Sequence, residues 1–495
     1  MNVRAPFAAL ALLLLGGCGV LASHSDDGVA IARADPAPPL VGRKWPDAQI
    51  ARVRSVLDAA LSSPYFKSGG VAIADSSGRV IYQRNATHAF APASTFKTLV
   101  AATALATLGS DTRFSTRLVS LEQPDAAGNI DDLWLIGSGD PVLDPDQMRD
   151  GIGALYRAGV RRVDGDVVVD PTAFKTPEQN KGWAPDDFEY DYAAGTSVIS
   201  LNWNVIQFKV TPTQLGAPPR VTIVPANPDI TIRNSARTGY RTDLVVQRIA
   251  PGRNEFTMTG TVGSGQQIFF RPVDGIPLWA GQVVAEMLRE RGIAFDGNIR
   301  LGTDPVADQT LWQHSSPPLR VLIRQMLVPS DNHIAEQLLR ILGTRGGDSL
   351  TVPAGTESAG ALVERAYLQS LGVSTPGLRI VDGSGLAGSD RIAPITLVQL
   401  LQAVANSRIG SDYVTAFARA GIEGTVRYHD VGAARGRVRA KSGHIGGVNA
   451  LCGYIETRHH GRIAFSFVVN ARGADEIDAI DDGMDKAIQA MYAAL

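Results

Sequence analysis

Apolar residues recur at two different spacings along the chain, and the change of spacing divides it into helical and β-rich stretches. In 46–61 they lie three and four residues apart, which predicts an amphipathic helix. Two short apolar runs around an Asp-Ser-Ser-Gly turn in 71–82 predict a β-hairpin. A third apolar stretch, 92–108, predicts a second helix, for which Gly109 is the expected C-terminal cap.

From about residue 111 to residue 309 the pattern changes to short apolar runs, many of them rich in β-branched residues, and such runs predict strands. The strands are expected at 116–120, 132–136, 163–169, 205–210, 221–224, 243–247 and 267–271. Helices are few in this region, and 277–291 is the clearest. We interpret 111–309 as one or two β-rich domains inserted into another domain.

Helical spacing returns after residue 310. The expected helices are 319–327, 332–342, 357–371 and 394–404, followed by a hairpin at 449–470 and a closing helix at 474–493. Hairpins and helices at both ends suit one antiparallel sheet covered by helices. The predicted fold class is therefore α+β, with a helix-covered domain formed by 46–110 and 310–495 and interrupted by the insertion.

The first 22 residues have the pattern of an export signal, in which Arg4 precedes an apolar core too short to span a bilayer. Two cleavage sites remain open. Leu15–Cys18 resembles a lipobox, after which Cys18 would carry a lipid anchor, whereas Val20–Ala22 is an ordinary small-residue site. Either way we expect an exported protein, periplasmic or attached to the cell envelope, with 23–45 as a linker.

Composition narrows the function. The net charge of −2 argues against a nucleic-acid partner, which would require a basic surplus. Cys18 and Cys452 are the only cysteines, so loss or lipidation of Cys18 leaves no internal disulfide. Neither a His-Glu-x-x-His pattern nor a phosphate-binding loop occurs, so we expect no metal and no cofactor.

Ser94 and Lys97 form a Ser-x-x-Lys pair at the start of the predicted helix 92–108. Residues three apart share a helix face, so the hydroxyl and the amine can touch. Pro92 suits the first turn of a helix, where free backbone N–H groups favour a negative charge such as an oxyanion. The same spacing also arises by chance in a chain of this length, so the pair alone does not establish catalysis.

Two further motifs follow. Ser330-Asp331-Asn332 lies between two predicted helices, and taken alone it is a good helix N-cap. Lys441-Ser442-Gly443 precedes the last hairpin, where a lysine, a hydroxyl and a glycine on an edge strand suit a bound carboxylate. Taken alone, it is an ordinary charged edge strand. All three motifs in this order are far less expected by chance.

Together the three motifs resemble those of the penicillin-recognising enzymes. The long stretch between the first and second motifs narrows the resemblance to the class C low-molecular-mass penicillin-binding proteins, the D-alanyl-D-alanine carboxypeptidase/endopeptidase family. Less specific local matches to the same family occur at 133–141, 201–204, 382–386 and 449–454. With them the resemblance runs from about residue 46 to the C-terminus. The resemblance implies a transpeptidase-like domain of the penicillin-binding-protein/β-lactamase type, with inserted β-rich domains.

The resemblance also implies acyl transfer in which Ser94 is the nucleophile and Lys97 its base. A free lysine titrates near 10.4, so a base at neutral pH needs a lower pKa, which we attribute to burial and to the positive charge of Lys441. Ser330 is expected to relay a proton to the leaving amine, and Asn332 to hydrogen-bond the substrate amide.

The third motif is expected to bind the substrate. The resemblance implies that Lys441 and Ser442 hold the terminal carboxylate of the substrate, and that Gly443 lets the ligand approach the backbone. It also implies that the backbone N–H groups of Ser94 and His444 form the oxyanion hole. His444 departs from the family pattern, which has Thr or Ser there, so a hydroxyl is lost.

The expected function is hydrolysis of D-alanyl-D-alanine bonds, or of D-alanyl cross-links, in peptidoglycan stem peptides, with β-lactams acylating the same serine. The sequence leaves the balance of carboxypeptidase and endopeptidase action open. Two alternatives remain: a β-lactamase or esterase on the same scaffold, and a non-catalytic protein that binds β-lactams or muropeptides.

Overall fold

The computed structural model describes residues 22–24, 30–32, 45–175, 177–305, 309–345, 352–470 and 474–495. The predicted signal segment up to residue 21, including Cys18, lies outside them, as does 33–44 of the predicted linker. Two short strands near the N-terminus, β1 (Ala22–His24) and β2 (Ala30–Ala32), form an antiparallel pair. No helix within the described residues has the length and apolar character needed to cross a membrane.

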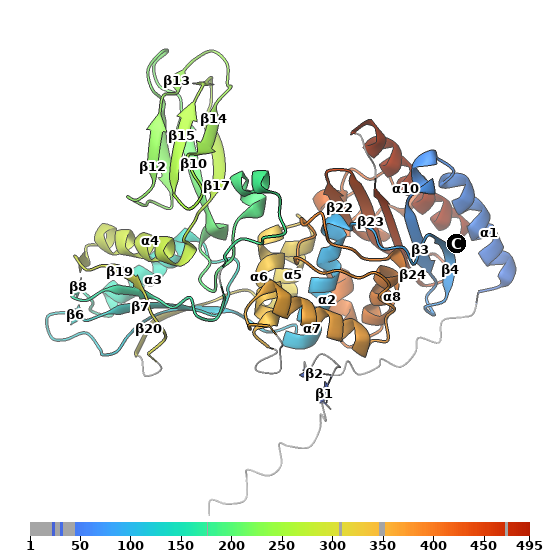
Figure 1. Cartoon of the computed structure of the whole chain (residues 1–495), viewed down its shortest axis with the longest axis horizontal. Coiled ribbons are helices and arrows are strands. Elements are labelled where there is room, and N and C mark those ends of the chain that lie inside the picture. Colours follow the sequence, from blue (N-terminus) through green and yellow to red (C-terminus); the bar gives the residue numbers. More distant parts are fainter. Residues whose placement is uncertain are drawn as a thin grey trace, which may run out of the picture.

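Six antiparallel strands form the sheet of the helix-covered domain (Figure 1). Their order is β21 (Ala418–Arg419), β22 (Val438–Ile445), β23 (Val448–Glu456), β24 (Arg462–Asn470), β3 (Gly70–Ala74) and β4 (Val80–Arg84). The N-terminal hairpin joins the C-terminal hairpin where β3 pairs with β24, from Ala74 opposite Ala464 to Gly70 opposite Val468. Both ends of the chain therefore build one sheet, as the hairpin pattern predicts.

Helices cover both faces of this sheet because both faces are apolar; β3, for example, is buried at every position. On one face lie α1 (Asp47–Ala60) and α10 (Ala474–Ala494), and Val53 and Ile488 of these helices share a hydrophobic cluster with Phe465 of β24. On the other face, α8 (Pro394–Ala405) packs against β3 and β24.

The remaining helices of this domain surround α2 (Lys97–Leu108), which is buried from Lys97 to Leu105 and is therefore a central helix. Around it lie α5 (Leu319–Leu327), α6 (Asn332–Gly343), α7 (Glu357–Ser370) and α9 (Gly410–Ala416). The sequence pattern predicts all of these helices except α9.

The insertion is β-rich, as predicted, and its largest sheet has five strands. Their order is β19 (Ile299–Leu301), β9 (Val167–Val169), β7 (Leu133–Gly137), β5 (Ser115–Ser120) and β20 (Gln309–Ser315). β5 and β20, at the two ends of the insertion, pair with each other. β20 extends past the boundary predicted at residue 309, and the domain boundaries remain a prediction.

Two helices, α3 (Pro145–Arg157) and α4 (Ile276–Arg291), pack against this sheet. The pattern predicts α4 but misses α3. The start of α3 is fixed by a capping box, in which Asp144 Oδ1 accepts from the Gln147 N–H (2.8 Å) and Gln147 Oε1 accepts from the Asp144 N–H (2.9 Å). Its Asp-Pro-x-Gln sequence is a readable signal for a helix start.

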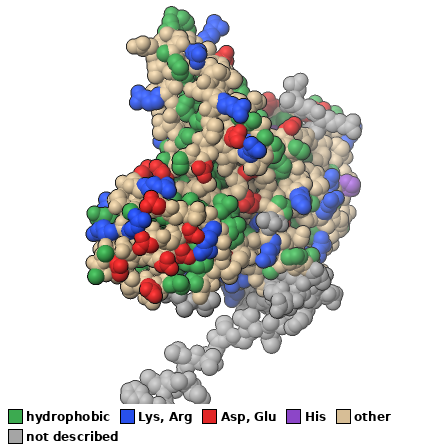
Figure 2. Space-filling view, turned by 60° about the vertical axis from the view of Figure 1, so that its left-hand side comes forward, with side chains coloured by type: hydrophobic (Ala, Val, Ile, Leu, Met, Phe, Trp, Pro, Cys, Tyr) green, Lys and Arg blue, Asp and Glu red, His purple; other side chains and the backbone are tan. Residues whose placement is uncertain are grey.

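Smaller sheets complete the insertion. One three-stranded sheet has the order β18 (Ala294–Phe295), β8 (Arg162–Val163) and β6 (Asn129–Ile130), and a second has the order β11 (Arg220–Val224), β10 (Val205–Thr211) and β17 (Gln267–Pro272). A third has the order β12 (Thr231–Asn234), β15 (Glu255–Thr259) and β14 (Val245–Arg248). The last sheet is the pair β13 (Arg237–Thr238) and β16 (Thr261–Val262). The single strand predicted at 163–169 is thus two strands, β8 and β9. The sheets around β10 and β15 project from the body, with Lys and Arg scattered over their surface (Figure 2).

Candidate active site

Ser94 lies in a 3₁₀ turn, Ala93–Phe96, that leads directly into α2. The predicted helix is therefore regular only from Lys97, which corrects the expectation that it begins at Pro92. The turn depends on Ala93, whose φ of 47° is in the left-handed region. Gly385 permits this conformation to pack, because a Cβ at that position would collide with the Ala93 carbonyl oxygen.

Lys97 is fully buried, and its amine makes three hydrogen bonds. Nζ donates to Ser94 Oγ (2.9 Å), to Asn332 Oδ1 (2.7 Å) and to the Ser384 carbonyl oxygen (2.8 Å). Burial lowers the pKa of Lys97 to about 8, although nearby carboxylates, led by Asp382, oppose the shift. Lys97 is thus held against the Ser94 hydroxyl, and its pKa is about 8.

Lys441 of the third motif is also fully buried. Burial, together with the charge of Lys97, lowers the pKa of Lys441 well below its usual range. Of the two expected causes of the lowered pKa of Lys97, burial and the charge of Lys441, only burial is found. Burial lowers the pKa of Lys97, and Lys441 is not among the groups that shift it, whereas the charge of Lys97 does contribute to the lowered pKa of Lys441.

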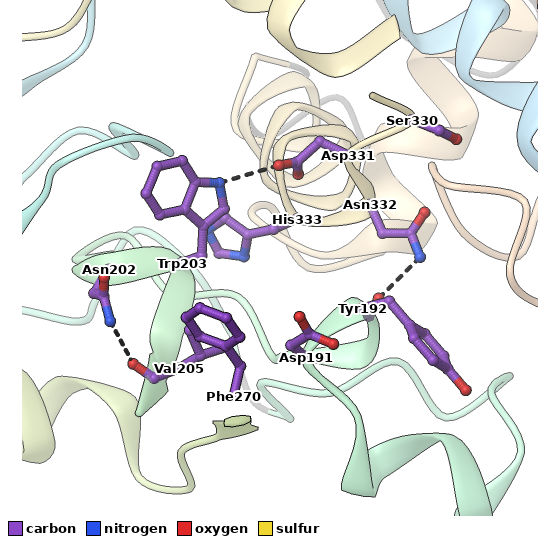
Figure 3. Close-up of a pocket in the computed structure, with 10 residues that line it drawn as sticks. All are labelled: Asp191, Tyr192, Asn202, Trp203, Val205, Phe270, Ser330, Asp331, Asn332 and His333. Atoms are coloured by element: carbon purple, nitrogen blue, oxygen red, sulfur yellow. Dashed lines mark hydrogen bonds between the residues drawn. The ribbon is translucent and has the colours of Figure 1, made fainter. Parts of the chain in front are cut away.

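The second motif begins α6. Asp331 Oδ1 accepts from the Ile334 N–H (2.8 Å), so Asp331 is the helix cap that the motif suggests when taken alone. Asn332 points the other way: Oδ1 accepts from Lys97, and Nδ2 donates to the Tyr192 carbonyl oxygen (2.9 Å) (Figure 3). Ser330 has a left-handed φ of 70°, which is uncommon for a residue with a side chain.

The third motif lies in β22, where Gly443 passes close to Ser94. A Cβ on Gly443 would lie 2.7 Å from the Pro92 carbonyl oxygen and 3.1 Å from the Ser94 nitrogen, so only glycine fits without a shift of the backbone. β21 pairs with Arg439 and Ala440 only. Beyond that point the motif lies on a strand edge open to an extended ligand.

The side chains around Gly443 point in different directions. Lys441 Nζ donates to the Ser442 carbonyl oxygen (2.6 Å), and Ser442 Oγ donates to Thr425 Oγ1 (2.7 Å). His444 is exposed and interacts electrostatically with Asp481 of α10. Burial raises the pKa of Asp481, and His429 opposes that shift more strongly than His444 does.

Buried carboxylates behind the site hold the Ser384 carbonyl toward Lys97, and the sequence analysis did not predict them. Glu336 Oε1 accepts from the N–H groups of Gly383 (3.0 Å) and Ser384 (2.7 Å). Asp382 accepts from the Gly385 N–H (2.6 Å) and from Trp183 Nε1 (2.8 Å). Burial and the charge of Asp382 raise the pKa of Glu336. One signal was available, since Glu336 stands four residues after Asn332 and so shares its helix face.

A cleft of about 750 Å³ brings the three motifs together. Ser94, Ser330, Asn332 and His444 line it, with Trp183 and Leu386 among the residues opposite. A second cavity of about 410 Å³ lies between the second motif and the insertion, and Trp203, Phe270 and Tyr192 line part of it (Figure 3). The first and second motifs, and His444 directly after the third, thus contribute predicted residues to the wall of the cleft. Lys97, Lys441, Ser442 and Gly443 are not among the residues that line it.

Comparisons with known proteins agree with this arrangement. The model of the D-Ala-D-Ala carboxypeptidase 3 (S13) family matches residues 53–491. A D-alanyl-D-alanine carboxypeptidase from Actinomadura sp. (strain R39) is 31% identical over 460 residues, which cover 88% of this chain and 84% of that protein. The D-alanyl-D-alanine carboxypeptidase DacB of Haemophilus influenzae is 24% identical and covers 81% of this chain and 85% of its own length.

Solved structures show the same fold. The crystal structure of penicillin-binding protein 4 (dacB) from Haemophilus influenzae superposes with a TM-score of 0.75 at 22% identity, covering 89% of this chain and 98% of that one. A structure of the same protein in complex with a β-lactam gives a TM-score of 0.69 at 23% identity and the same coverage. The predicted fold class is thereby confirmed, and the chain belongs to the D-Ala-D-Ala carboxypeptidase 3 (S13) family of serine peptidases.

Proposed function

We propose that the protein hydrolyses the bond between two D-alanine residues of peptidoglycan stem peptides through an ester on Ser94. The observation that carries this proposal is the environment of the Lys97 amine. A neutral amine has two N–H groups and one lone pair. Asn332 Oδ1 and the Ser384 carbonyl oxygen accept the two N–H groups of the neutral amine. The contact with Ser94 Oγ, 2.9 Å away, in which the charged amine donates, then reverses, and the lone pair faces the hydroxyl.

Acylation follows from this arrangement. Ser94 Oγ attacks the carbonyl carbon while its proton passes to Lys97 Nζ. The backbone N–H groups of Ser94 and His444 donate hydrogen bonds to the developing oxyanion. The C–N bond then breaks, the leaving amine takes a proton through Ser330, and Lys97 returns to its neutral state. Water attacks the ester in the second half of the reaction, which restores the Ser94 hydroxyl.

Lys441 and Ser442 hold the carboxylate that ends the substrate. The buried Lys441 amine, whose pKa lies well below its usual range, gains a partner when an anionic ligand arrives. An opposite charge at hydrogen-bond distance favours the protonated form of an amine, so an anionic ligand and the Lys441 ammonium stabilise each other. Anionic substrates are thereby distinguished from neutral ones.

The same site accepts a terminal D-alanine or a cross-linked amine as the leaving group, so carboxypeptidase and endopeptidase action share one acyl-enzyme. β-Lactams acylate Ser94 in this proposal; a structural relative in complex with a β-lactam supports it. Because peptidoglycan lies outside the cytoplasm, we also propose that the N-terminal segment directs export. Labelling with a fatty-acid analogue, lost in Cys18→Ser, would identify a lipid anchor.

The decisive experiment is to incubate the protein with a fluorescent penicillin and locate the label by peptide mass spectrometry. A stable adduct on Ser94, absent in Ser94→Ala, is expected. Release of free D-alanine from a stem peptide by the parent protein, and not by Ser94→Ala, is the matching test with substrate. Fast hydrolysis of the penicillin without an adduct would favour a β-lactamase, and neither adduct nor hydrolysis would leave a non-catalytic binding protein.

A further inference from the structure

A hydrogen bond joins the insertion to the second motif. The indole nitrogen of Trp203, Nε1, donates to Asp331 Oδ2 at 3.1 Å, across the cavity shown in Figure 3. Asp331 is the middle residue of the motif, and it is partly buried there. Trp203 lies 128 residues away in the sequence, so the bond depends entirely on how the insertion folds back on α6.

Trp203 reaches Asp331 from a strained turn. Asn202, Trp203 and Asn204 have φ values of 52°, 54° and 57°. Residues with side chains enter the left-handed region singly and at a cost, so three in succession persist only where their surroundings impose them. Strain of this kind clusters at functional sites, where it holds a side chain in a required position.

Hydrogen bonds on both sides of Trp203 impose the turn. Asn202 Nδ2 donates to the Val205 carbonyl oxygen (2.7 Å), and Asn204 Nδ2 donates to the Gly195 carbonyl oxygen (3.0 Å). Asn204 Oδ1 also accepts from the Leu201 N–H (3.1 Å). Two asparagines therefore fix the backbone around Trp203, and its indole is aimed at the motif.

Asp331 makes three hydrogen bonds, and one of them is to a residue of the insertion. Its N–H donates to the Met326 carbonyl oxygen (2.9 Å), and Oδ1 caps α6 at Ile334. Both partners belong to the helices that flank the motif. The indole of Trp203 donates to the remaining carboxylate oxygen, Oδ2, so that both oxygens of the Asp331 side chain have a partner.

We propose that Trp203 is a positioning residue for acyl transfer. By holding Asp331 it fixes the neighbours on either side, Ser330 in its left-handed conformation and Asn332 against the Lys97 amine. A residue of the insertion thus helps to hold the second motif in the position that the proposed reaction needs. This inference rests on the proposed function, because it concerns the same acyl-enzyme reaction.

Trp203→Phe tests the proposal, since it keeps the ring and removes the N–H. Trp134→Phe in β7 is a matched control, because Trp134 Nε1 is buried and has no hydrogen-bond partner among the described residues. We expect the second-order rate constant of acylation by penicillin to fall roughly ten- to a hundredfold in Trp203→Phe, as misplacement of catalytic groups does elsewhere. Trp134→Phe should acylate like the parent protein.

Stoichiometry separates positioning from folding. In Trp203→Phe the labelled fraction should still reach one adduct per molecule, only more slowly, whereas a purely structural defect would lower the labelled fraction and leave the rate of the folded remainder unchanged. The latter result would overturn the proposal, as would an unchanged rate at full labelling. If the parent protein itself forms no adduct on Ser94, the proposed function fails, and this inference with it.

Asp331→Asn supplies a second test that does not depend on the stability of Trp203→Phe. Asparagine keeps an oxygen for the α6 cap but turns an amide N–H toward the indole N–H, so a similar loss of rate is expected. The double variant should be no slower than the slower single variant, because both remove one interaction. Fully additive losses would contradict the proposal.

Discussion

The two buried lysines of the cleft have opposite surroundings. Lys97 has three oxygen acceptors within 2.9 Å, from Ser94, Asn332 and Ser384. Lys441 lies on a strand edge, and the hydrogen bond that the structure gives its amine goes to the carbonyl oxygen of its own neighbour, Ser442. In the proposed mechanism this difference means that the base, Lys97, is in place before any substrate arrives, whereas Lys441 gains its partner only from the substrate carboxylate.

Removing Lys97 should have the largest effect. Lys97→Ala is expected to slow acylation of Ser94 roughly a thousandfold, because it removes the proton acceptor. The rate constant for penicillin labelling measures it, with Thr98→Ala on the same helix as a control for packing. A residual rate close to that of the parent protein would mean that another group takes the proton.

Removing Lys441 should affect anionic ligands selectively. Lys441→Ala is expected to reduce acylation by a penicillin roughly ten- to a hundredfold, through loss of a charged hydrogen bond. An ester or thioester that lacks the carboxylate should lose far less, because it never used the charge. Comparing the two rate constants measures the contrast, and equal losses for both ligands would contradict the division of roles between the two lysines.

The pH dependence of the acylation rate should follow the protonation of Lys97. The base acts in its neutral form, which becomes more abundant as pH rises through the pKa of Lys97, about 8. Acylation by an uncharged ester should therefore increase about tenfold per pH unit well below that value and level off above it. Stopped-flow labelling at a series of pH values measures the profile. A rate that is flat from pH 6 to pH 9 would exclude this role.

His444 should matter least. Its side chain is exposed and interacts with Asp481, and its proposed contribution to catalysis is a backbone N–H that any residue other than proline supplies. His444→Thr is expected to change the acylation rate by about twofold or less. A large gain in rate for carboxylate ligands would show that the hydroxyl missing at this position limits the native site.

The sequence predicts well those elements whose pattern is local. The helix expected at 319–327 coincides with α5, and both hairpins and the closing helix lie where the spacing of apolar residues indicates. The sequence pattern misses α3, although Asp144 and Gln147 provide a capping box at its start. Each of the three motifs could likewise be found from its own residues.

What the sequence does not reveal depends on contacts between distant segments. The left-handed Ala93 is accommodated by Gly385, almost 300 residues later, and the buried acids Asp382 and Glu336 act on Lys97 from two different elements. The strained turn at Trp203 is invisible for the same reason. No local pattern records such pairings, because they exist only once the chain is folded.

The most direct test of the central claim is to titrate the Lys97 amine in the free protein by NMR, with the lysine side chains labelled with ¹³C at Cε and Lys97→Arg used to assign the resonance. If the base is prepared before the substrate arrives, the Lys97 signal titrates with a pKa of about 8 in the absence of any ligand. A signal that titrates near the ordinary lysine value of about 10.4 would contradict the account, because Lys97 would then be an ordinary cation until the substrate binds.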